Sequence, residues 1–298
     1  MATDARRAPG DLLVVGHTVL DRYWDVRKLP TPDRTVPVES VRLVLGGTAA
    51  NIARAAAGRG LRVGLVSRVG PDFPVEFRRE LTESRVDLGG FETVPDERSP
   101  TCLIVEDGRG GQMTLIDQGA MADAARAVLP LGLLHRYPWV HLTTGDPAFQ
   151  LRMLAAAREE GSRVAADPAQ EIHYRWAAPA LRRLLRGSEL FLGNEAEAAA
   201  AARMMGMSGV ARLTRAVPLV VVTRGKKGAR AYSRTGVVDA PGRPPRRLLQ
   251  VTGAGDSFRG GFYAAWLHGA ALPGALRAGV TAATEWIESA KFPKRGTP

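Results

Sequence analysis

The stretch Leu190-Phe-Leu-Gly-Asn-Glu-Ala-Glu-Ala-Ala-Ala-Ala-Ala-Arg-Met-Met205 joins a short apolar run to an Ala-rich segment of helical period. The same pairing recurs along the chain. Further apolar runs lie at Leu12–Val15, Val63–Val66, Val140–Leu142, Val164–Ala166 and Leu219–Val222. Amphipathic segments of helical period lie at Ala49–Arg59, Pro147–Glu160 and Ala178–Arg186. Short buried strands alternating with helices predict a layered α/β fold, in which helices flank a mainly parallel central sheet.

Two regions depart from this alternation. Arg22–Val44 contains three prolines among alternating polar and apolar residues, so a helix cannot run through it. Thr101–Glu106 and Gln112–Asp117 alternate around Asp107-Gly-Arg-Gly-Gly111, a pattern typical of a β-hairpin. We therefore expect a small antiparallel β lid, formed by residues from about 22–44 and 98–119, over one edge of a single domain spanning residues 1–298.

The composition excludes several classes of protein. A chain of 298 residues is long enough to bury a full core, and its single cysteine, Cys102, excludes a disulfide framework and a cysteine zinc site. The sequence contains no apolar run of about 18 residues, the length needed to span a membrane. Its first residues lack the apolar core of a signal peptide. We expect a cytoplasmic protein with no membrane partner.

The net charge of +11 is unevenly distributed. Residues 1–100 carry 15 basic and 14 acidic side chains, and residues 101–200 carry 10 and 12. Residues 201–298 carry 16 basic and 4 acidic side chains, so the excess lies in the last third. A local excess of this kind suits a polyphosphate pocket at least as well as a DNA-binding surface.

The segment Thr252-Gly-Ala-Gly-Asp-Ser-Phe258 carries the strongest chemical signal. Gly253 and Gly255 permit a tight turn whose backbone N–H groups converge on an anion. The Ala-rich run that follows begins a helix, whose positive end adds to this site. Asp256 would lie beside a phosphoryl group, where its carboxylate can accept a proton from an attacking hydroxyl. The alternative is an ordinary helix start with Asp in its favoured first turn.

Two other segments place an asparagine near the start of a helix. Leu45–Asn51 contains paired glycines that let the backbone approach a ligand, although a plain loop before a helix is the simpler explanation of that segment alone. Phe191–Glu197 ends a strand with Asn194 and Glu197 at the spacing of a helix cap, at the sheet edge where ligands bind in open α/β sheets. The chain contains only two asparagines, and their presence in these two segments favours a functional site.

Several nucleotide and metal motifs are absent from the sequence. Gly225-Lys-Lys227 lacks the upstream glycine and the hydroxyl residue of a P-loop, and no G-x-G-x-x-G follows the first apolar run. The five histidines never have metal-ligand spacing. We expect His17 to pack or to form hydrogen bonds rather than to act in catalysis.

Together, Gly46-Gly-Thr-Ala-Ala-Asn51 and Thr252-Gly-Ala-Gly-Asp256 resemble the N- and C-terminal signatures of the ribokinase (PfkB) family of small-molecule kinases. The resemblance extends from about Leu12 to Ala290 and implies a ribokinase-like fold with a β lid. Within the family, the sequence is most similar to the archaeal-type nucleoside kinases. Four segments carry that closer likeness: Gly16–Asp21, Gly111–Thr114, Thr144–Phe149 and Asp167–Gln170.

The resemblance implies a role for each matching position. Asp256 would be the general base for the 5′-hydroxyl, and Gly253, Ala254 and Gly255 would form the anion hole. The nucleoside would be bound by Asp21, Gly47, Asn51, Gln112 and Gln170, the last two near the nucleobase. The ATP-binding residues would be Asn194, Thr223 and Gly225. Asn194 and Glu197 would order Mg²⁺ and its waters, and Arg224, Lys226 and Lys227 are candidates to attract ATP.

The activity implied by the resemblance is Mg²⁺- and ATP-dependent phosphorylation of a nucleoside at its 5′-hydroxyl. A sugar kinase of the same family, acting on ribose, a ketohexose or a sugar acid, is the first alternative. A non-catalytic nucleic-acid-binding relative is the second, and the nearly neutral first two thirds of the chain and the presence of Asp256 count against it. We expect no nucleic-acid partner, and the edge strands of the lid allow a homodimer.

One segment departs from the family pattern. The family usually reads D-T-x-G-A-G-D, whereas Gln250 and Val251 occupy the first two positions here. The missing aspartate commonly supports a monovalent-cation site beside the anion hole. Its absence leaves activation by potassium in doubt but retains Asp256.

Overall fold

The computed structural model describes residues 10–289, so residues 1–9 and 290–298 of the expected single domain lie outside the described part. The strands are β1 (Leu12–Val15), β2 (Val19–Val26), β3 (Val38–Gly46), β4 (Val63–Val69), β5 (Val86–Thr93), β6 (Thr101–Glu106), β7 (Gln112–Asp117), β8 (Trp139–Leu142), β9 (Arg163–Ala166), β10 (Leu190–Asn194), β11 (Leu219–Thr223), β12 (Ala229–Ser233) and β13 (Gly236–Ala240). The helices are α1 (Thr48–Ala57), α2 (Val75–Glu83), α3 (Leu131–Leu134), α4 (Pro147–Glu159), α5 (Ala178–Arg186), α6 (Glu195–Met204), α7 (Ala254–Leu267) and α8 (Leu272–Glu288).

The larger sheet has nine strands in the order β13-β12-β11-β10-β9-β8-β1-β4-β5. Its strands from β5 to β11 pair in parallel, which confirms the predicted α/β fold. Each of the six predicted apolar runs lies in one of these parallel strands. The hairpin of β12 and β13 extends the sheet in antiparallel fashion, an addition that the apolar runs did not predict.

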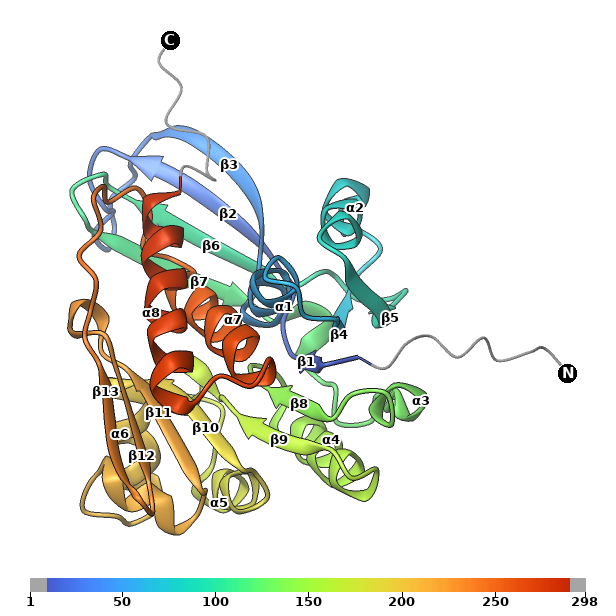
Figure 1. The fold of residues 1–298 in the computed structure, drawn as a ribbon. Helices are drawn as coiled ribbons and strands as arrows, with labels where there is room; N and C mark the ends of the chain where they lie inside the picture. Colours follow the sequence, from blue (N-terminus) through green and yellow to red (C-terminus); the bar gives the residue numbers. More distant parts are fainter. Residues whose placement is uncertain (1–9, 290–298) are drawn as a thin grey trace, which may run out of the picture.

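Both faces of this sheet are covered by helices (Figure 1). Alternate residues of β1 enter different cores, because successive side chains of a strand point to opposite faces. Leu12 and Val14 join the core beneath α1, α7 and α8, whereas Leu13 and Val15 join the core beneath α4, α5 and α6. The apolar runs are therefore continuous because both of their faces are buried.

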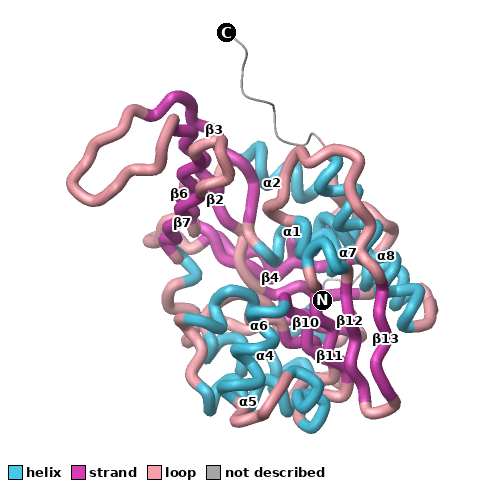
Figure 2. The backbone as a smooth tube through the Cα atoms, turned by 90° about the vertical axis from the view of Figure 1, so that its left-hand side faces the viewer, coloured by secondary structure: helices cyan, strands magenta, loops and turns pink. Residues whose placement is uncertain are grey.

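The second sheet has four strands in the order β3-β2-β6-β7 and stands beyond one end of the larger sheet (Figure 2). The predicted hairpin of β6 and β7 is confirmed, and β2 and β3 also pair in antiparallel fashion. The central pair, β2 and β6, is parallel, contrary to a wholly antiparallel lid. The reason is topological: β2 follows β1 and β6 follows β5, so both leave the larger sheet from the same edge and run in the same direction.

The carboxyl ends of the parallel strands converge on one edge of the larger sheet. Asn194 at the end of β10 is the register partner of Thr223 at the end of β11, and β1 ends just before β2 enters the lid. Ligands of open α/β sheets bind at this edge. Between residues 10 and 289, none of the helices has the length and apolar character needed to cross a membrane.

Candidate functional site

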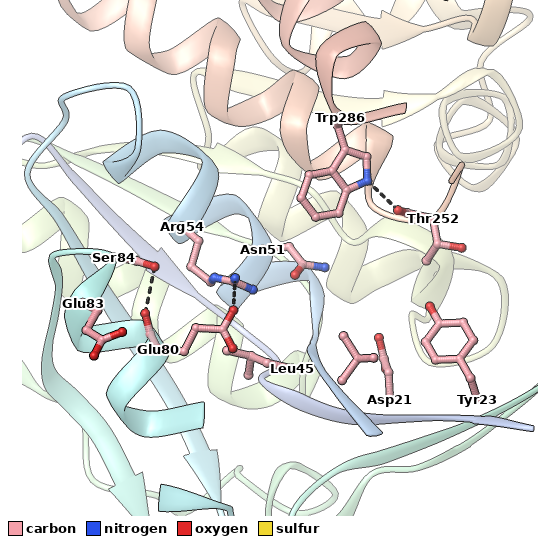
Figure 3. Close-up of a pocket in the computed structure, with 11 residues that line it drawn as sticks. Asp21, Tyr23, Leu45, Asn51, Arg54, Glu80, Glu83, Ser84, Thr252 and Trp286 are labelled. Carbon is pink, nitrogen blue, oxygen red and sulfur yellow. Dashed lines mark hydrogen bonds and ion pairs between the residues drawn. The ribbon is translucent and has the colours of Figure 1, made fainter. Parts of the chain in front are cut away.

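The predicted anion hole lies at the start of α7, where Gly253 adopts a left-handed conformation (φ 86°). The indole Nε1 of Trp286, on α8, donates to the carbonyl of Thr252 at 2.7 Å (Figure 3). A Cβ atom on Gly253 would lie 3.0 Å from the Trp286 ring. The left-handed conformation favours glycine here, and a Cβ atom would also press on the Trp286 ring. The Trp286 hydrogen bond ties this turn to α8.

Asp256 occupies the first turn of α7 and contacts α1. Asn51 Nδ2 donates to Asp256 Oδ2 at 3.0 Å, which joins the two segments that the sequence singled out. Burial raises the pKa of Asp256 to about 7, although the Arg259 charge and the Asn51 hydrogen bond favour the ionised form. A carboxyl group that titrates near neutral pH is suited to general base catalysis.

A cavity of about 180 Å³ lies between the lid and the larger sheet. Its lining includes all of the predicted nucleoside-binding residues and the predicted base: Asp21, Gly47, Asn51, Gln112, Gln170 and Asp256. They come from β2, β7, α1, α7 and the loop after β9, so the fold brings together residues from both ends of the chain.

Backbone and carboxylate approach each other closely at one side of this cavity. Gly47 has a positive φ of 96°, and a Cβ atom there would lie 2.5 Å from the His17 carbonyl oxygen. A Cβ atom on Gly46 would lie 1.9 Å from Asp21 Oδ2. Burial, and then the negative charge of Asp256, raise the pKa of Asp21 to about 7. The paired glycines therefore make room for a carboxylate that faces the cavity.

Sequence reasoning missed several residues that line the same cavity. Glu171 and Tyr174 follow Gln170 in the loop after β9, and Cys102 lies on β6. Glu171 is buried and accepts from the Gly145 N–H at 2.6 Å. His17, expected to pack or to form hydrogen bonds, also lines the cavity, with Nδ1 3.9 Å from Glu171 Oε1. The proximity of Glu171 to Gln170 in sequence was the one local signal for this group.

A second cavity of about 430 Å³ shares Asp21, Asn51 and Thr252 with the first. It opens toward α2, where Arg54 of α1 forms an ion pair with Glu80 (Figure 3). Figure 3 shows Asp21 and Thr252 on one side of this space and the Arg54–Glu80 pair on the other. The site is thus continuous with open space beside α1.

The predicted ATP-binding residues lie at the carboxyl ends of β10 and β11, with Gly225 in a turn just after β11. Asn194 Oδ1 accepts from the Glu197 N–H at 2.9 Å, and Glu197 Oε2 accepts from the Asn194 N–H at 2.7 Å. The capping explanation of this segment is therefore confirmed. Arg224 lies 3.3 Å from Glu195, so part of its charge is offset within the protein.

Gln250 lies where the family pattern has an aspartate, and its side chain bonds to the end of α8. Its Nε2 donates to the Trp286 carbonyl at 3.1 Å and to Ser289 Oγ at 3.0 Å, while its buried Oε1 has no hydrogen-bond partner among the described residues. The neutral Gln250 amide therefore does not supply the carboxylate charge of the family pattern, and its N–H group is engaged by two oxygens at the end of α8.

Comparisons with known proteins agree with this geometry. A model of the pfkB family of carbohydrate kinases matches residues 10–291. A nucleoside kinase from Methanothermobacter thermautotrophicus is 35% identical over 266 residues, covering 88% of this chain and 84% of that protein. A cytidine kinase from Thermococcus kodakarensis is 30% identical over 286 residues, covering 93% and 96%. The structure of the Methanocaldococcus jannaschii nucleoside kinase superposes with a TM-score of 0.86 at 26% identity, covering 95% of this chain and 94% of that one.

Proposed function

Because this chain belongs to the pfkB family of carbohydrate kinases, we propose that it transfers the γ-phosphoryl group of ATP to the 5′-hydroxyl of a nucleoside. The fold is ribokinase-like, and the chain is a phosphotransferase that acts on an alcohol group. One observation carries the proposal. One cavity contains both Asp21 and Asp256, and Asp256 lies in the first turn of α7, which no side chain caps, although the Ala254 N–H already donates to the Val251 carbonyl at 3.1 Å.

The proposed reaction divides the work among these residues. Asp21, Gly47 and Asn51 hold the ribose, so that its 5′-hydroxyl faces Asp256. The Asp256 carboxylate accepts the hydroxyl proton as the oxygen attacks the γ-phosphorus, and the bond to ADP breaks. The N–H groups of the Gly253–Gly255 turn bind the oxygens of the transferring group, whose negative charge they stabilise.

In this proposal, different elements of the fold bind the nucleobase and ATP. Gln170, after β9, and Gln112, on the lid strand β7, lie at the nucleobase end of the cavity in this proposal. Asn194, Thr223 and Gly225 bind ATP at the carboxyl edge of the sheet. The lid excludes water that would otherwise accept the phosphoryl group.

Mg²⁺ is proposed to be held through water by Asn194 and Glu197. The capping box uses Asn194 Oδ1 and Glu197 Oε2, so Glu197 Oε1 remains for a metal-bound water. Within residues 10–289, no group of three or more His, Cys, Asp or Glu side chains is placed to hold a metal ion. Mg²⁺ usually retains several waters and takes ligands from substrate phosphates, so it needs few ligands from the protein. When bound, Mg²⁺ neutralises charge on the phosphates.

We also propose that the protein acts in the cytoplasm, as its single cysteine and its use of ATP suggest. A homodimer through the lid is the proposed assembly. Val41 and Leu43 on β3 and Leu115 on β7 are exposed apolar side chains, and β3 and β7 are the two edges of the lid sheet. Unpaired edge strands offer a surface for a second copy.

A panel of nucleosides and sugars in an ADP-release assay tests the proposed function. We expect turnover with nucleosides and little with ribose, ketohexoses or sugar acids. The Asp256→Asn variant, purified in parallel, controls for contaminating kinases. Activity confined to free sugars would replace the proposal by a sugar kinase, and salt-sensitive retention on DNA or RNA without any turnover would replace it by a nucleic-acid-binding function.

Lowering the pH is expected to reduce the rate. Only the ionised form of Asp256 accepts a proton, and burial raises the pKa of Asp256 to about 7. The pKa of Asp21 is raised to about 7 as well, so the acid limb reports the pair of carboxyl groups together. We expect kcat/KM to rise with pH through about 7 and to fall about tenfold per unit well below it. A profile that is flat from about pH 5.5 to 8 would contradict the role of Asp256.

Potassium is expected to have no effect on the rate. Because the Gln250 amide already bonds to Trp286 and Ser289, no cation is needed to hold these groups together. Replacing KCl by choline chloride at constant ionic strength should change kcat less than about twofold, an energy below about 0.4 kcal/mol. A clear loss of activity in choline chloride would show that a cation binds despite Gln250.

A further inference from the structure

A chain of buried polar side chains lies directly beneath the proposed anion hole. Arg259 is in the second turn of α7, Asp167 follows β9, His141 is in β8 and Tyr263 lies one turn after Arg259. Arg259 is 5% exposed, and the other three side chains are fully buried. None of the four was assigned a role by the motifs that identify the family.

These side chains are tightly connected. The Arg259 guanidinium binds Asp167 in a bidentate manner, with Nη2 donating to Oδ1 at 2.8 Å and Nε donating to Oδ2. His141 Nε2 lies 3.3 Å from Asp167 Oδ2, and His141 Nδ1 lies 2.8 Å from the Tyr263 hydroxyl. Burial opposes ionisation of Asp167, but the charge of Arg259 holds the pKa of that carboxyl below its usual value. The buried pair is therefore charged.

Burying an ion pair in a protein interior costs free energy of desolvation. Taking both ions out of water costs several kcal/mol each, and a well-packed apolar pair is often as stable or more stable. The fold alone therefore gives no reason for an arginine at this position of α7. A functional role for its positive charge would give such a reason, and the groups around Arg259 indicate that role.

Arg259 faces the groups that the proposed reaction employs. Its Nη1, the guanidinium nitrogen that Asp167 does not bind, is 3.0 Å from the place where a Cβ atom on Gly255 would lie. The positive charge of Arg259 acts on Asp256 and on Glu197. Asp167, Asp256 and Glu197 would otherwise place three carboxyl groups around the point where an anionic triphosphate must bind.

We propose that Arg259 is a positioning residue for phosphoryl transfer, a fixed positive charge that holds the Gly253–Gly255 turn in place and offsets the negative charge that gathers there in the transition state. This inference rests on the proposed function and deepens it. Asp167 fixes the orientation of the guanidinium by accepting hydrogen bonds from it on both carboxylate oxygens. Because the charge is preorganised and shielded from water, it acts more strongly than an exposed one.

The test compares Arg259→Met, which keeps an unbranched side chain like the aliphatic stem of arginine but removes the charge, with Arg259→Lys, which keeps the charge but removes the planar fork. We expect Arg259→Met to lower kcat about 10²-fold, with the KM values for nucleoside and ATP changed less than about threefold. The kcat of Arg259→Lys should be at least about tenfold higher than that of Arg259→Met. Arg136→Met is the matched control, because Arg136 forms an ion pair with Asp87 at 3.2 Å at the opposite edge of the larger sheet. The kcat of Arg136→Met should equal that of the wild-type protein.

A second variant separates the proposed role from folding. Arg259→Met alone leaves the Asp167 charge buried without a partner, which can unfold the protein. The double variant Asp167→Asn/Arg259→Met removes both charges and is expected to melt close to the wild-type temperature while kcat stays about 10²-fold low. Near-normal kcat in this double variant would overturn the proposal and make the pair purely structural. If the wild-type protein phosphorylates no nucleoside at all, the proposed function fails instead.

Discussion

Replacing Asp256 by Asn is expected to lower kcat for nucleoside phosphorylation by at least about 10³-fold, near the upper range for loss of a general base. The amide has the shape of the carboxylate but cannot accept the hydroxyl proton. The other two carboxyl groups that line the cavity, Asp21 and Glu171, come from β2 and from the loop after β9 rather than from the start of α7, so we expect neither to replace Asp256 without movement of the substrate. ATP affinity, measured by calorimetry, should change little because the N–H groups at the start of α7 remain.

Asp11→Asn is the control for this variant. Asp11 accepts three hydrogen bonds from Arg62 at the start of β1, at the opposite end of the larger sheet from Asp256. Its substitution also removes one carboxylate, so any general effect of the loss of charge would appear in both variants. We expect normal kcat for Asp11→Asn. A kcat within about tenfold of wild type for Asp256→Asn would assign the base to another residue or to water.

Gly253→Ala is expected to lower kcat by about 10²- to 10³-fold, the loss typical of one misplaced oxyanion donor. The substitution forces a residue with a side chain into a left-handed conformation. Its Cβ atom would also lie 3.0 Å from the Trp286 ring, whose N–H holds the Thr252 carbonyl. Either the Trp286 ring or the turn must then give by a few tenths of an ångström, and we expect the strained turn to present its N–H groups less accurately to the transferring group.

Gly269→Ala distinguishes this effect from backbone strain. Gly269 follows α7 with φ 91°, and a Cβ atom there meets nothing within 4 Å. Both variants should lose about 1–2 kcal/mol of unfolding free energy from the left-handed conformation, seen as a lower melting temperature. Only Gly253→Ala should lose kcat. Equal kcat in the two variants would show that the Gly253 turn is not part of the catalytic apparatus.

The layered fold was predictable because its signals are local. Leu12–Val15 and Leu190–Leu192 are apolar on both faces, as a central parallel strand must be, and the hairpin around Asp107 carries its own turn residues. The hairpin of β12 and β13 was missed because its strands at the edge of the sheet mix exposed and buried residues. The parallel pairing of β2 with β6 was missed because it depends on where β1 and β5 end in space.

The candidate site likewise has features that the local sequence predicts and contacts that it does not predict. Asn194 and Glu197 are three residues apart, so their capping box could be anticipated from spacing alone. The bond between Asn51 and Asp256 joins residues 205 positions apart, and the Arg259–Asp167 pair joins residues 92 positions apart. The resemblance to the family motifs already placed Asn51 and Asp256 in one predicted site. It did not indicate the Arg259–Asp167 pair.

By itself, then, the sequence determined the alternation of strands and helices, the glycine turn before Asp256 and the cap at Asn194, because each depends on neighbours within one turn or one strand. The tertiary structure alone decided that Asp21, Asn51 and Asp256 line one cavity, and that a charged arginine is buried beneath the proposed anion hole. Such contacts depend on how strands are ordered and helices packed across the whole chain. The sequence could not show that one basic residue of the last third, Arg259, is bound by Asp167 beside Gly255.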